Sequence, residues 1–232
     1  MNYYKKQRLL KEPLAVYAIL AVTTLVFLYM EVIGPLTGWG NSQSGMMLIR
    51  MGAMWAPLVR AGQWWRFITP IFLHIGWTHF LMNMFTLYFM GRLMEEAYGH
   101  VRFLIVYLLS GILGNILSFS LSSGSVSAGA STSLFGMFAG FAVLKLFFPE
   151  NKYIQLLSRQ YMMLIGINLA MNLFMPSVDM MGHVGGAIGG ALIGIVVAIP
   201  GNTHRYKLHQ RVAAGICFVG IAFICLYFGY FF

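Results

Sequence analysis

Residues 182–194, which read GHVGGAIGGALIG, decide how this chain packs. Glycine recurs at every fourth position of this stretch, forming what we call the glycine stripe: Gly182, Gly186, Gly190 and Gly194. Such a row of small residues on one face of a helix lets a neighbouring helix approach closely, as helices do inside membranes. Residues 131–148 form another apolar run, with Gly136 and Gly140 at the same spacing. The sequence therefore predicts a close contact between these two helices.

The composition is that of an integral membrane protein. Of the 232 residues, 59% are hydrophobic and only 9% are charged, whereas about a quarter of the residues in a typical soluble domain carry a charge. The net charge is +9. Basic residues clustered between apolar spans usually record membrane topology rather than nucleic-acid binding. We therefore expect a lipid bilayer around the protein and no nucleic-acid partner.

Seven apolar runs are long enough to cross a bilayer as helices, which takes roughly 17–25 residues each. They lie at about residues 13–33, 69–91, 101–121, 131–148, 158–175, 182–199 and 212–231. The first run is too long for the core of a signal peptide, so it is expected to be retained as a span. The predicted fold class is all-α and polytopic.

These spans divide the chain into four segments. They are an N-terminal tail at 1–12, the first six spans at 13–199, a basic linker at 200–211 and the seventh span at 212–231. Within the first six spans, the first connection, 34–66, is the long one. Its tryptophans, which include Trp64 and Trp65, suit a segment that lies in the headgroup interface.

The distribution of Lys and Arg predicts a cytoplasmic N-terminus. With that orientation, twelve basic residues lie in inside segments, and three lie outside, at Arg50, Arg60 and Arg66. An excess of basic residues on the cytoplasmic side is the usual pattern. The fourth span has eighteen residues and is only about 27 Å long. Its first residue, Ser131, should therefore lie below the outer surface, where irregular backbone is tolerated only against protein or a water-filled cavity.

Three spans enter from the predicted outer side, and each carries a polar residue near that end. The second has His79 and Asn83, which are four residues apart and so share a helix face. The fourth begins at Ser131, and the sixth carries His183 inside the glycine stripe. Ionisable residues within a span are candidates for function because their burial is costly.

These residue types fit nucleophilic catalysis. A serine hydroxyl is a weak nucleophile unless a base takes its proton, and the usual base is histidine, which points to Ser131 and His183. The backbone N–H of Ser131 and the side chains of Asn83 and His79 are candidate donors to the oxyanion. Asp179 lies in a loop four residues before His183 and could orient its ring only if the helix began early. A Ser–His dyad is therefore favoured.

Other interpretations of the same residues are less specific. Ser131 at a span end could merely cap a helix, and the glycine stripe could merely pack helices. Three further amides, Asn115, Asn168 and Asn172, are expected to join helices, and His74 is expected to brace the long outer loop. An aspartyl protease needs two aspartates, and a zinc protease of the His-Glu-x-x-His type needs that motif. The chain has only one aspartate and no such motif, so no metal and no cofactor are predicted.

The motifs of this chain resemble those of the rhomboid family of intramembrane serine proteases. The carrying residues are Trp65-Arg66, the pattern His74-x4-His79-x3-Asn83, the segment 91–95, Gly129-x-Ser131 with Phe135-Gly136, and His183-x-Gly185-Gly186. They follow the family's order over residues 65–194. Thr132 stands where the family often has Gly, and Phe135 where Tyr is common.

The resemblance implies a six-helix rhomboid core with one extra C-terminal transmembrane helix. It implies Ser131 as nucleophile and His183 as general base, with Asn83, His79 and the Ser131 N–H as the oxyanion hole. Phe135, which can pack on the imidazole ring, and Gly129 would support the site. The fifth span and the loop 175–181 would act as a lateral gate and a cap.

The implied activity is that of a serine endopeptidase that hydrolyses peptide bonds in or next to transmembrane segments, without a cofactor. The expected substrates are single-pass membrane proteins within the lipid bilayer. The expected location is the bacterial cell membrane, with a cytoplasmic N-terminus and an active site that opens to the outside. One alternative is a non-proteolytic rhomboid-like protein that binds membrane clients. Another is a small transporter, but no repeat relates the two halves of the chain, as transporter folds often require.

Overall fold

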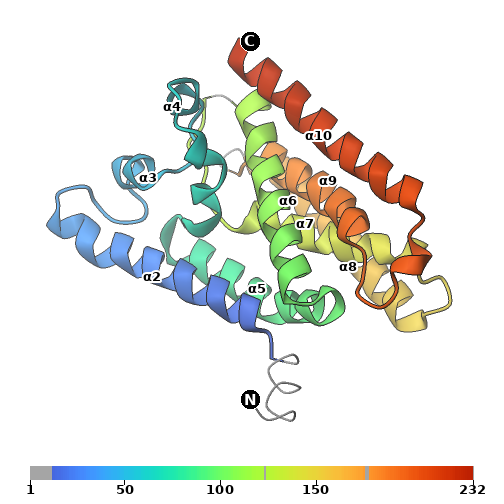
Figure 1. The fold of residues 1–232 in the computed structure, drawn as a ribbon. Coiled ribbons are helices and arrows are strands. Elements are labelled where there is room, and N and C mark those ends of the chain that lie inside the picture. Colours follow the sequence, from blue (N-terminus) through green and yellow to red (C-terminus); the bar gives the residue numbers. More distant parts are fainter. Residues whose placement is uncertain (1–11, 123, 176–177, 232) are drawn as a thin grey trace, which may run out of the picture.

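The computed structural model describes residues 12–122, 124–175 and 178–231. Nearly all of the tail predicted at 1–12 lies outside the described residues. The helices, which can be followed by label and colour in Figure 1, are α2 (Leu14–Leu36), α3 (Gly45–Met51), α4 (Ala56–Arg60), η1 (Trp64–Phe67), η2 (Thr69–Phe72), α5 (Gly76–Tyr98), α6 (His100–Leu121), α7 (Ser131–Ala142), η3 (Val143–Leu146), α8 (Lys152–Asn172), α9 (Met180–Val197), η4 (Thr203–Arg205) and α10 (Leu208–Phe231). In the described part, the extended backbone pairs only at one bridge, between Met54 and Ser127.

Seven of these helices correspond in order to the seven predicted spans. Four of them, α2, α6, α9 and α10, are long and apolar enough to cross a membrane, and Ser131–Leu146 forms a shorter apolar stretch. Helices α5 and α8 have 23 and 21 residues, which is also enough length, but they carry more charged and polar side chains. The chain is therefore an all-α, multi-pass membrane protein, as its sequence predicts.

The predicted start of the second span is wrong by about two turns. Residues 64–72 form the short 3-10 helices η1 and η2, and α5 begins only at Gly76. Gly76 has a φ of +74°, a conformation that other residues rarely adopt, and its N–H donates to Ser42 Oγ at 3.0 Å. The apolar run in the sequence includes η2 because Pro70 and Ile71 of this segment are buried.

The same helix also runs further than its apolar stretch, to Tyr98, because a charged residue in its last turns is satisfied by a distant segment. Glu95 is only 3% exposed. Its carboxylate accepts hydrogen bonds from the backbone N–H groups of Ala15 and Val16, both at 2.8 Å, and it also pairs with His100. The N–H groups at the start of α2 have no partner within their own helix, so this contact fixes α2 to α5.

Helices α8 and α9 begin earlier than the predicted fifth and sixth spans because a polar side chain caps each of them. Asn151 accepts hydrogen bonds from the N–H groups of Tyr153 and Ile154, both at 3.1 Å. Asp179 accepts one from the N–H of Gly182 at 2.9 Å. Asn and Asp are among the preferred residues at this position of a helix.

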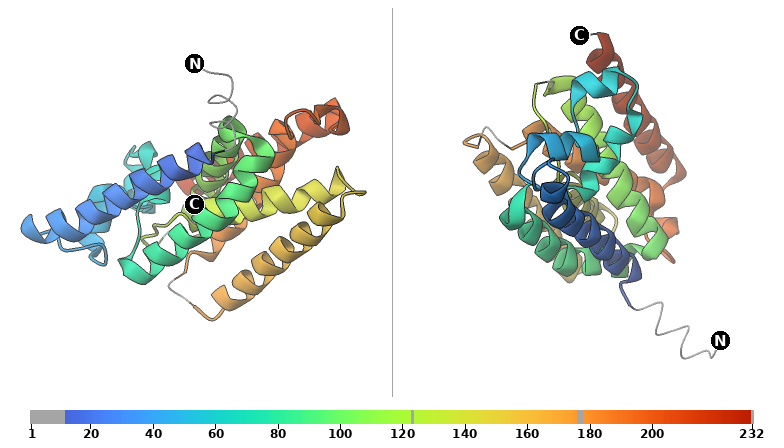
Figure 2. Two further views of the ribbon diagram at one scale, coloured as in Figure 1. Left: turned by 90° about the horizontal axis from the view of Figure 1, so that it is seen from below. Right: turned by 90° about the vertical axis from the view of Figure 1, so that its left-hand side faces the viewer.

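At the centre of the molecule, helices α6, α7 and α9 pack against one another (Figures 1 and 2). The glycine stripe faces α7: a methyl group on Gly190 would overlap the backbone of Gly136, and one on Gly186 would overlap that of Thr132. The adjacent Gly185 and Gly189 face α6 in the same way. The predicted close contact between α9 and α7 is confirmed.

The remaining helices surround α6, α7 and α9. Helix α2 packs along α5, and α10 packs on α6 and α9. Figure 2 shows α8 at the edge of the molecule, beside α7. Of the 21 residues of α8, only Ser158 and Tyr161 are buried, so α8 is attached less tightly than the central helices.

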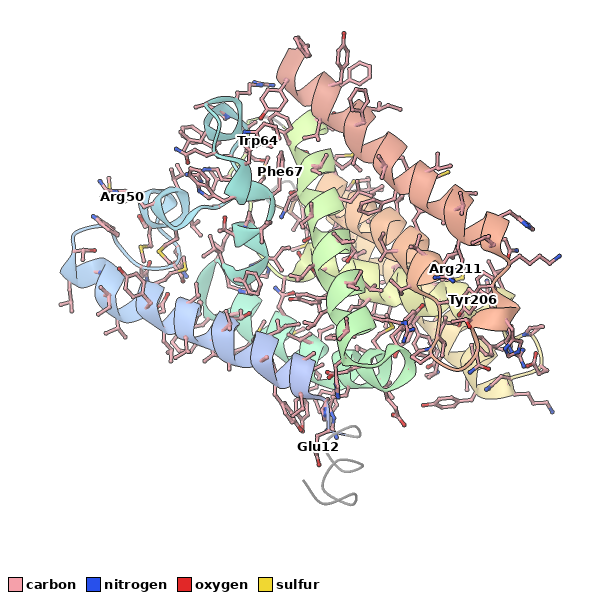
Figure 3. The ribbon with its side chains drawn as sticks, in the orientation of Figure 1. Glu12, Arg50, Trp64, Phe67, Tyr206 and Arg211 are labelled. Carbon is pink, nitrogen blue, oxygen red and sulfur yellow. The ribbon has the colours of Figure 1, made fainter. Side chains whose placement is uncertain are left out.

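The long first connection is folded and held by one arginine. The Arg66 guanidinium donates to the carbonyl oxygens of Ala53 and Ile49 at 2.6 and 2.8 Å, and to Gln63 Oε1 at 2.8 Å. Trp64 and Trp65 stay exposed, at 59% and 53%. In Figure 3, Arg50 and Trp64 lie at one end of the bundle, while Glu12, Tyr206 and Arg211 lie towards the other.

Candidate active site

The turn before Ser131 is held in place by backbone contacts with the first connection. Ser127 and Met54 exchange two hydrogen bonds, at 2.9 and 3.0 Å, and the Gly129 N–H donates to the Pro70 carbonyl at 2.9 Å. Gly129 has a φ of +149°, and a Cβ there would lie 2.7 Å from the imidazole Cε1 of His79. Only glycine fits this position, since both the backbone conformation and the neighbouring ring exclude a side chain.

Ser131 is the first residue of α7, and its hydroxyl meets His183 from α9. Ser131 Oγ lies 2.7 Å from His183 Nε2, which is a hydrogen-bonding distance. The ring of Phe135, one turn further along α7, stacks on the imidazole with centroids 4.3 Å apart and planes 9° apart. His183 is only 8% exposed. The glycine stripe makes this contact possible, because it brings the backbones of α7 and α9 together.

Three potential donors gather beside this pair. Asn83 is 6% exposed, and its Nδ2 has no hydrogen-bond partner among the described residues. His79 Nδ1 accepts from the Ile75 N–H at 3.4 Å, so a neutral His79 carries its proton on Nε2 and can donate it. The N–H of Ser131 is at a helix start, where backbone N–H groups have no acceptor in their own helix. Ser131, His79 and Asn83 all line one pocket.

That pocket has a volume of about 840 Å³ and lies between α5, α7 and α8. Its walls are mostly apolar, with Met82, Phe85, Phe89, Leu134, Phe138 and Leu164 among the lining residues. Its polar groups are concentrated where Ser131 and His183 meet. Ligand pockets commonly combine apolar walls with a few placed polar groups in this way.

His183 has a second partner that the sequence did not reveal. Its Nδ1 lies 2.7 Å from the side-chain amide of Asn172, the last residue of α8. Asp179 does not take this place, since its carboxylate caps α9 at Gly182. Asn172 thus joins α8 to α9, as expected, although nothing in the sequence indicates that its partner is His183. Asn168 in fact donates to Leu164 in its own helix, at 2.8 Å.

His74 supports the turn before Ser131 rather than the outer loop. It is fully buried, and its Nε2 accepts from the Ala130 N–H at 3.4 Å. Burial, with a smaller contribution from the nearby His79, lowers the pKa of His74 from 6.5 to about 3. His74 is therefore neutral at ordinary pH. Asn115, by contrast, does join elements as expected, donating to the Phe67 carbonyl at 2.9 Å.

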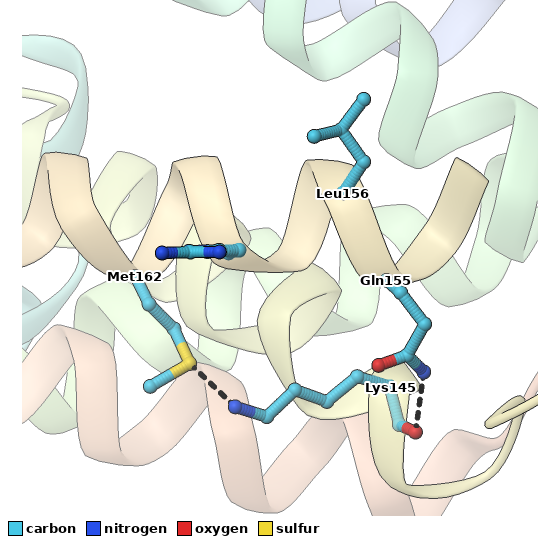
Figure 4. Close-up of a pocket in the computed structure, with 5 residues that line it drawn as sticks. Lys145, Gln155, Leu156 and Met162 are labelled. Atoms are coloured by element: carbon cyan, nitrogen blue, oxygen red, sulfur yellow. Dashed lines mark hydrogen bonds between the residues drawn. The ribbon is translucent and has the colours of Figure 1, made fainter. Parts of the chain in front are cut away.

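A second pocket, of about 570 Å³, lies beside α8 and η3 (Figure 4). Lys145 Nζ lies 3.0 Å from Met162 Sδ, and Gln155 donates to the Lys145 carbonyl at 2.9 Å. This pocket is lined by cationic, amide and apolar side chains and contains no nucleophile with a base. Among the described residues, no three His, Cys, Asp or Glu side chains are grouped so that they could hold a metal ion. The pocket at Ser131 is therefore the candidate active site.

Comparisons with known proteins point to one family. A family model described as "Rhomboid domain" matches residues 61–200. The chain is 32% identical over 219 residues to "Rhomboid protease GluP" of Bacillus subtilis (strain 168), covering 94% of this chain and 41% of that protein. It is 34% identical over 169 residues to "RHOMBOID-like protein 7" of Arabidopsis thaliana, covering 71% and 52%. It is 36% identical over 149 residues to "Rhomboid-like protease 3" of Toxoplasma gondii, covering 63% and 56%. The chain thus spans about half the length of these relatives.

Proposed function

The chain belongs to the rhomboid family, and on that premise we propose that it is an intramembrane serine endopeptidase with Ser131 as nucleophile and His183 as general base. The observation that carries the proposal is the 2.7 Å contact between Ser131 Oγ and His183 Nε2. Two of the relatives that the chain resembles are named as proteases. A serine within hydrogen-bonding reach of an imidazole is the arrangement that nucleophilic catalysis requires.

The reaction begins when Ser131 Oγ attacks the carbonyl carbon of the scissile bond while His183 Nε2 takes the hydroxyl proton. The carbonyl oxygen becomes an oxyanion, which the Ser131 N–H and the side chains of Asn83 and His79 stabilise by donating hydrogen bonds. Collapse of this intermediate breaks the C–N bond, and His183 returns the proton to the departing amine. The product that remains is an ester of Ser131. Water, deprotonated by His183, then hydrolyses this ester and restores the hydroxyl.

The neighbours of the dyad suit this chemistry. Phe135 restricts the imidazole ring to one orientation by stacking on it. Gly129 lets His79 approach the nucleophile, since any side chain there would collide with the His79 ring. Asp179 caps the start of α9 through Oδ1, and the side-chain partners of His183 among the described residues are Ser131 and Asn172. The base therefore acts without a carboxylate partner.

The proposed substrates are single-pass membrane proteins whose transmembrane segments enter from the bilayer between α5 and α8. Both helices line the apolar pocket, and α8 buries few of its residues, so it is the helix that can move aside most easily. The loop 175–181 is the proposed cap over the pocket; residues 176 and 177 of this loop lie outside the described residues.

The proposed setting is the bacterial cell membrane, with a cytoplasmic N-terminus. In this orientation Arg50 and Trp64 are on the outer side, and Arg211, at the other end of the bundle in Figure 3, is inside. The positive-inside rule supports this arrangement. It places the N-terminal ends of α5, α7 and α9, and with them the pocket, at the outer side.

A fluorophosphonate probe, which reacts with activated serines, tests the assignment together with cleavage of a single-pass transmembrane substrate. Wild type is expected to be labelled and to cleave, whereas Ser131→Ala and His183→Ala lose both activities by about 1000-fold or more. Ser133→Ala is the matched control: Ser133 lies two residues further along α7, and its fully buried hydroxyl has no hydrogen-bond partner among the described residues. This control should retain both activities.

Labelling or cleavage that persists in Ser131→Ala would overturn the assignment. If wild type binds the transmembrane substrate without cleaving it, the alternative of a non-proteolytic client-binding protein is correct.

A further inference from the structure

Both ring nitrogens of His183 are engaged, and the partner on the side away from Ser131 comes from a different helix. Nε2 lies 2.7 Å from Ser131 Oγ, and Nδ1 lies 2.7 Å from Nδ2 of the Asn172 side chain. Asn172 is half-buried at the end of α8 and lines the pocket. Among the described residues, this contact is the only hydrogen bond of its side chain.

The proton on His183 must be on the correct nitrogen for the base to work. A neutral imidazole carries one N–H, and Nε2 can accept the serine proton only if that N–H is at Nδ1. Buried in this pocket, an Nδ1–H needs an acceptor, because an unpaired buried donor is costly. In the structure Asn172 turns its Nδ2 towards the ring. A half-turn about the Cβ–Cγ bond brings its carbonyl oxygen, which is an acceptor, to the same position.

We propose that Asn172 is a positioning residue, which accepts the Nδ1–H of His183 and so holds the imidazole in the tautomer and rotamer that activate Ser131. The inference rests on the proposed function and adds to it a third residue, contributed by α8. In serine proteases, the group bonded to Nδ1 commonly has this role. Here an uncharged amide performs it.

No other described group competes for this position. The titratable neighbours of His183 are Asp179, at the start of its own helix, and His79, on α5. Asp179 caps Gly182, and His79 faces the oxyanion side of the site. From α7 and α8, the ring is contacted by Phe135 and Asn172, and neither of these side chains titrates.

Three variants test the inference. Asn172→Leu keeps the approximate size of the side chain and removes the acceptor, whereas Asn172→Asp keeps an acceptor and cannot donate. Gln160→Leu is the matched control, since Gln160 is an exposed amide on the same helix, α8, and is not among the residues that line the pocket at Ser131. Each purified variant is assayed for kcat and KM on a transmembrane substrate across the pH range in which it stays folded.

Asn172→Leu is expected to lower kcat by about 10- to 100-fold, within the usual contribution of acid–base catalysis, with KM nearly unchanged. Asn172→Asp should keep most of kcat and move the acidic limb of the pH–rate profile to higher pH, because a carboxylate favours the protonated ring. Gln160→Leu should match wild type in both parameters. A residue that only packed α8 against α9 would not produce this shift of the profile.

The tautomer is read directly from the ¹⁵N NMR signals of the imidazole, assigned by their loss in His183→Ala. Wild type is expected to show Nδ1 protonated and Nε2 unprotonated, and Asn172→Leu to lose this preference. The inference is overturned if Asn172→Leu keeps the wild-type kcat, pH profile and tautomer, or if Gln160→Leu loses as much kcat. The dependence of cleavage on Ser131 is measured in parallel by comparing Ser131→Ala with wild type. If that dependence holds while Asn172→Leu is unaffected, only this inference fails and the proposed function stands.

Discussion

At the scale of single residues, the geometry of the candidate site depends on how His183 is held. Its ring is contacted on one face by Phe135, at one nitrogen by Ser131 and at the other by Asn172. Each contact comes from α7 or α8, while the backbone of His183 belongs to α9. The imidazole is therefore positioned by helices other than its own.

The stacked ring of Phe135 should contribute to the rate. Aromatic pairs are worth about 0.5–1.5 kcal/mol beyond the area they bury, so Phe135→Leu is expected to lower kcat by roughly 2- to 10-fold. Phe135→Tyr preserves the ring and should stay close to wild type. Cleavage assays of wild type, Phe135→Leu and Phe135→Tyr measure these rates. Equal rates for Phe135→Leu and wild type would show that stacking does not orient the base.

His74 should make stability depend on pH. Its pKa is about 3 in the folded protein against 6.5 for an exposed histidine, so the unfolded chain binds a proton that the folded chain does not. Its stabilising contribution is complete above pH 6.5 and is lost as the pH falls towards 3, by up to about 1.4 kcal/mol per pH unit. Thermal unfolding in detergent at several pH values between 7.5 and 4.5 measures this slope.

The control for this prediction is His74→Gln, which keeps an acceptor for the Ala130 N–H and does not titrate. Its stability should change less steeply over the same pH range. A slope equal to that of wild type would assign the acid sensitivity to other groups.

At the scale of elements, the glycine stripe sets the distance between α7 and α9. A methyl group at Gly190 would overlap the backbone of Gly136, and the helices would have to separate. Overpacking of this kind typically costs about 1–3 kcal/mol. Because Ser131 and His183 lie on these two helices, their hydrogen bond should lengthen as well.

Gly190→Ala is therefore expected to lower both the free energy of unfolding and the rate of fluorophosphonate labelling. Gly220→Ala on α10 serves as the control, since a Cβ at Gly220 would meet nothing within 4 Å. Ala has a higher helix propensity than Gly by about 1 kcal/mol, so the control should be neutral or slightly stabilised. Equal behaviour of the two variants would contradict the close-packing argument.

At the scale of the whole molecule, α10 stabilises the fold from the side away from the pocket. It contacts the outer loop through Arg60, which donates to the Gly229 carbonyl at 2.7 Å, and contacts α6 through Phe119 and Tyr230, whose ring centroids are 5.2 Å apart. No residue of α10 lines the pocket at Ser131. Its role should accordingly be structural.

Deletion of residues 208–232 is expected to lower Tm by at least about 5 °C, since 1 kcal/mol corresponds to roughly 2–4 °C in a domain of this size. Fluorophosphonate labelling of Ser131 should persist at temperatures well below the new Tm. Differential scanning fluorimetry and labelling of the same sample measure both quantities. A fully folded truncated protein that is no longer labelled would show that α10 acts on the site.

Much could be predicted from the sequence: the order of the helical spans, the contact of α9 with α7, and the convergence of His79, Asn83, Ser131 and His183, which line one pocket. These features follow from local patterns: apolar length, a fourfold glycine spacing, and polar residues at matching ends of spans. The catalytic roles of these residues stay predictions. The packing of the helices sets where α5 begins and ends, because the Gly76 N–H and the Glu95 carboxylate bond to segments far away in the chain. It also decided that Asn172, rather than Asp179, meets His183, since the angle between two packed helices is not encoded in the spacing along either one.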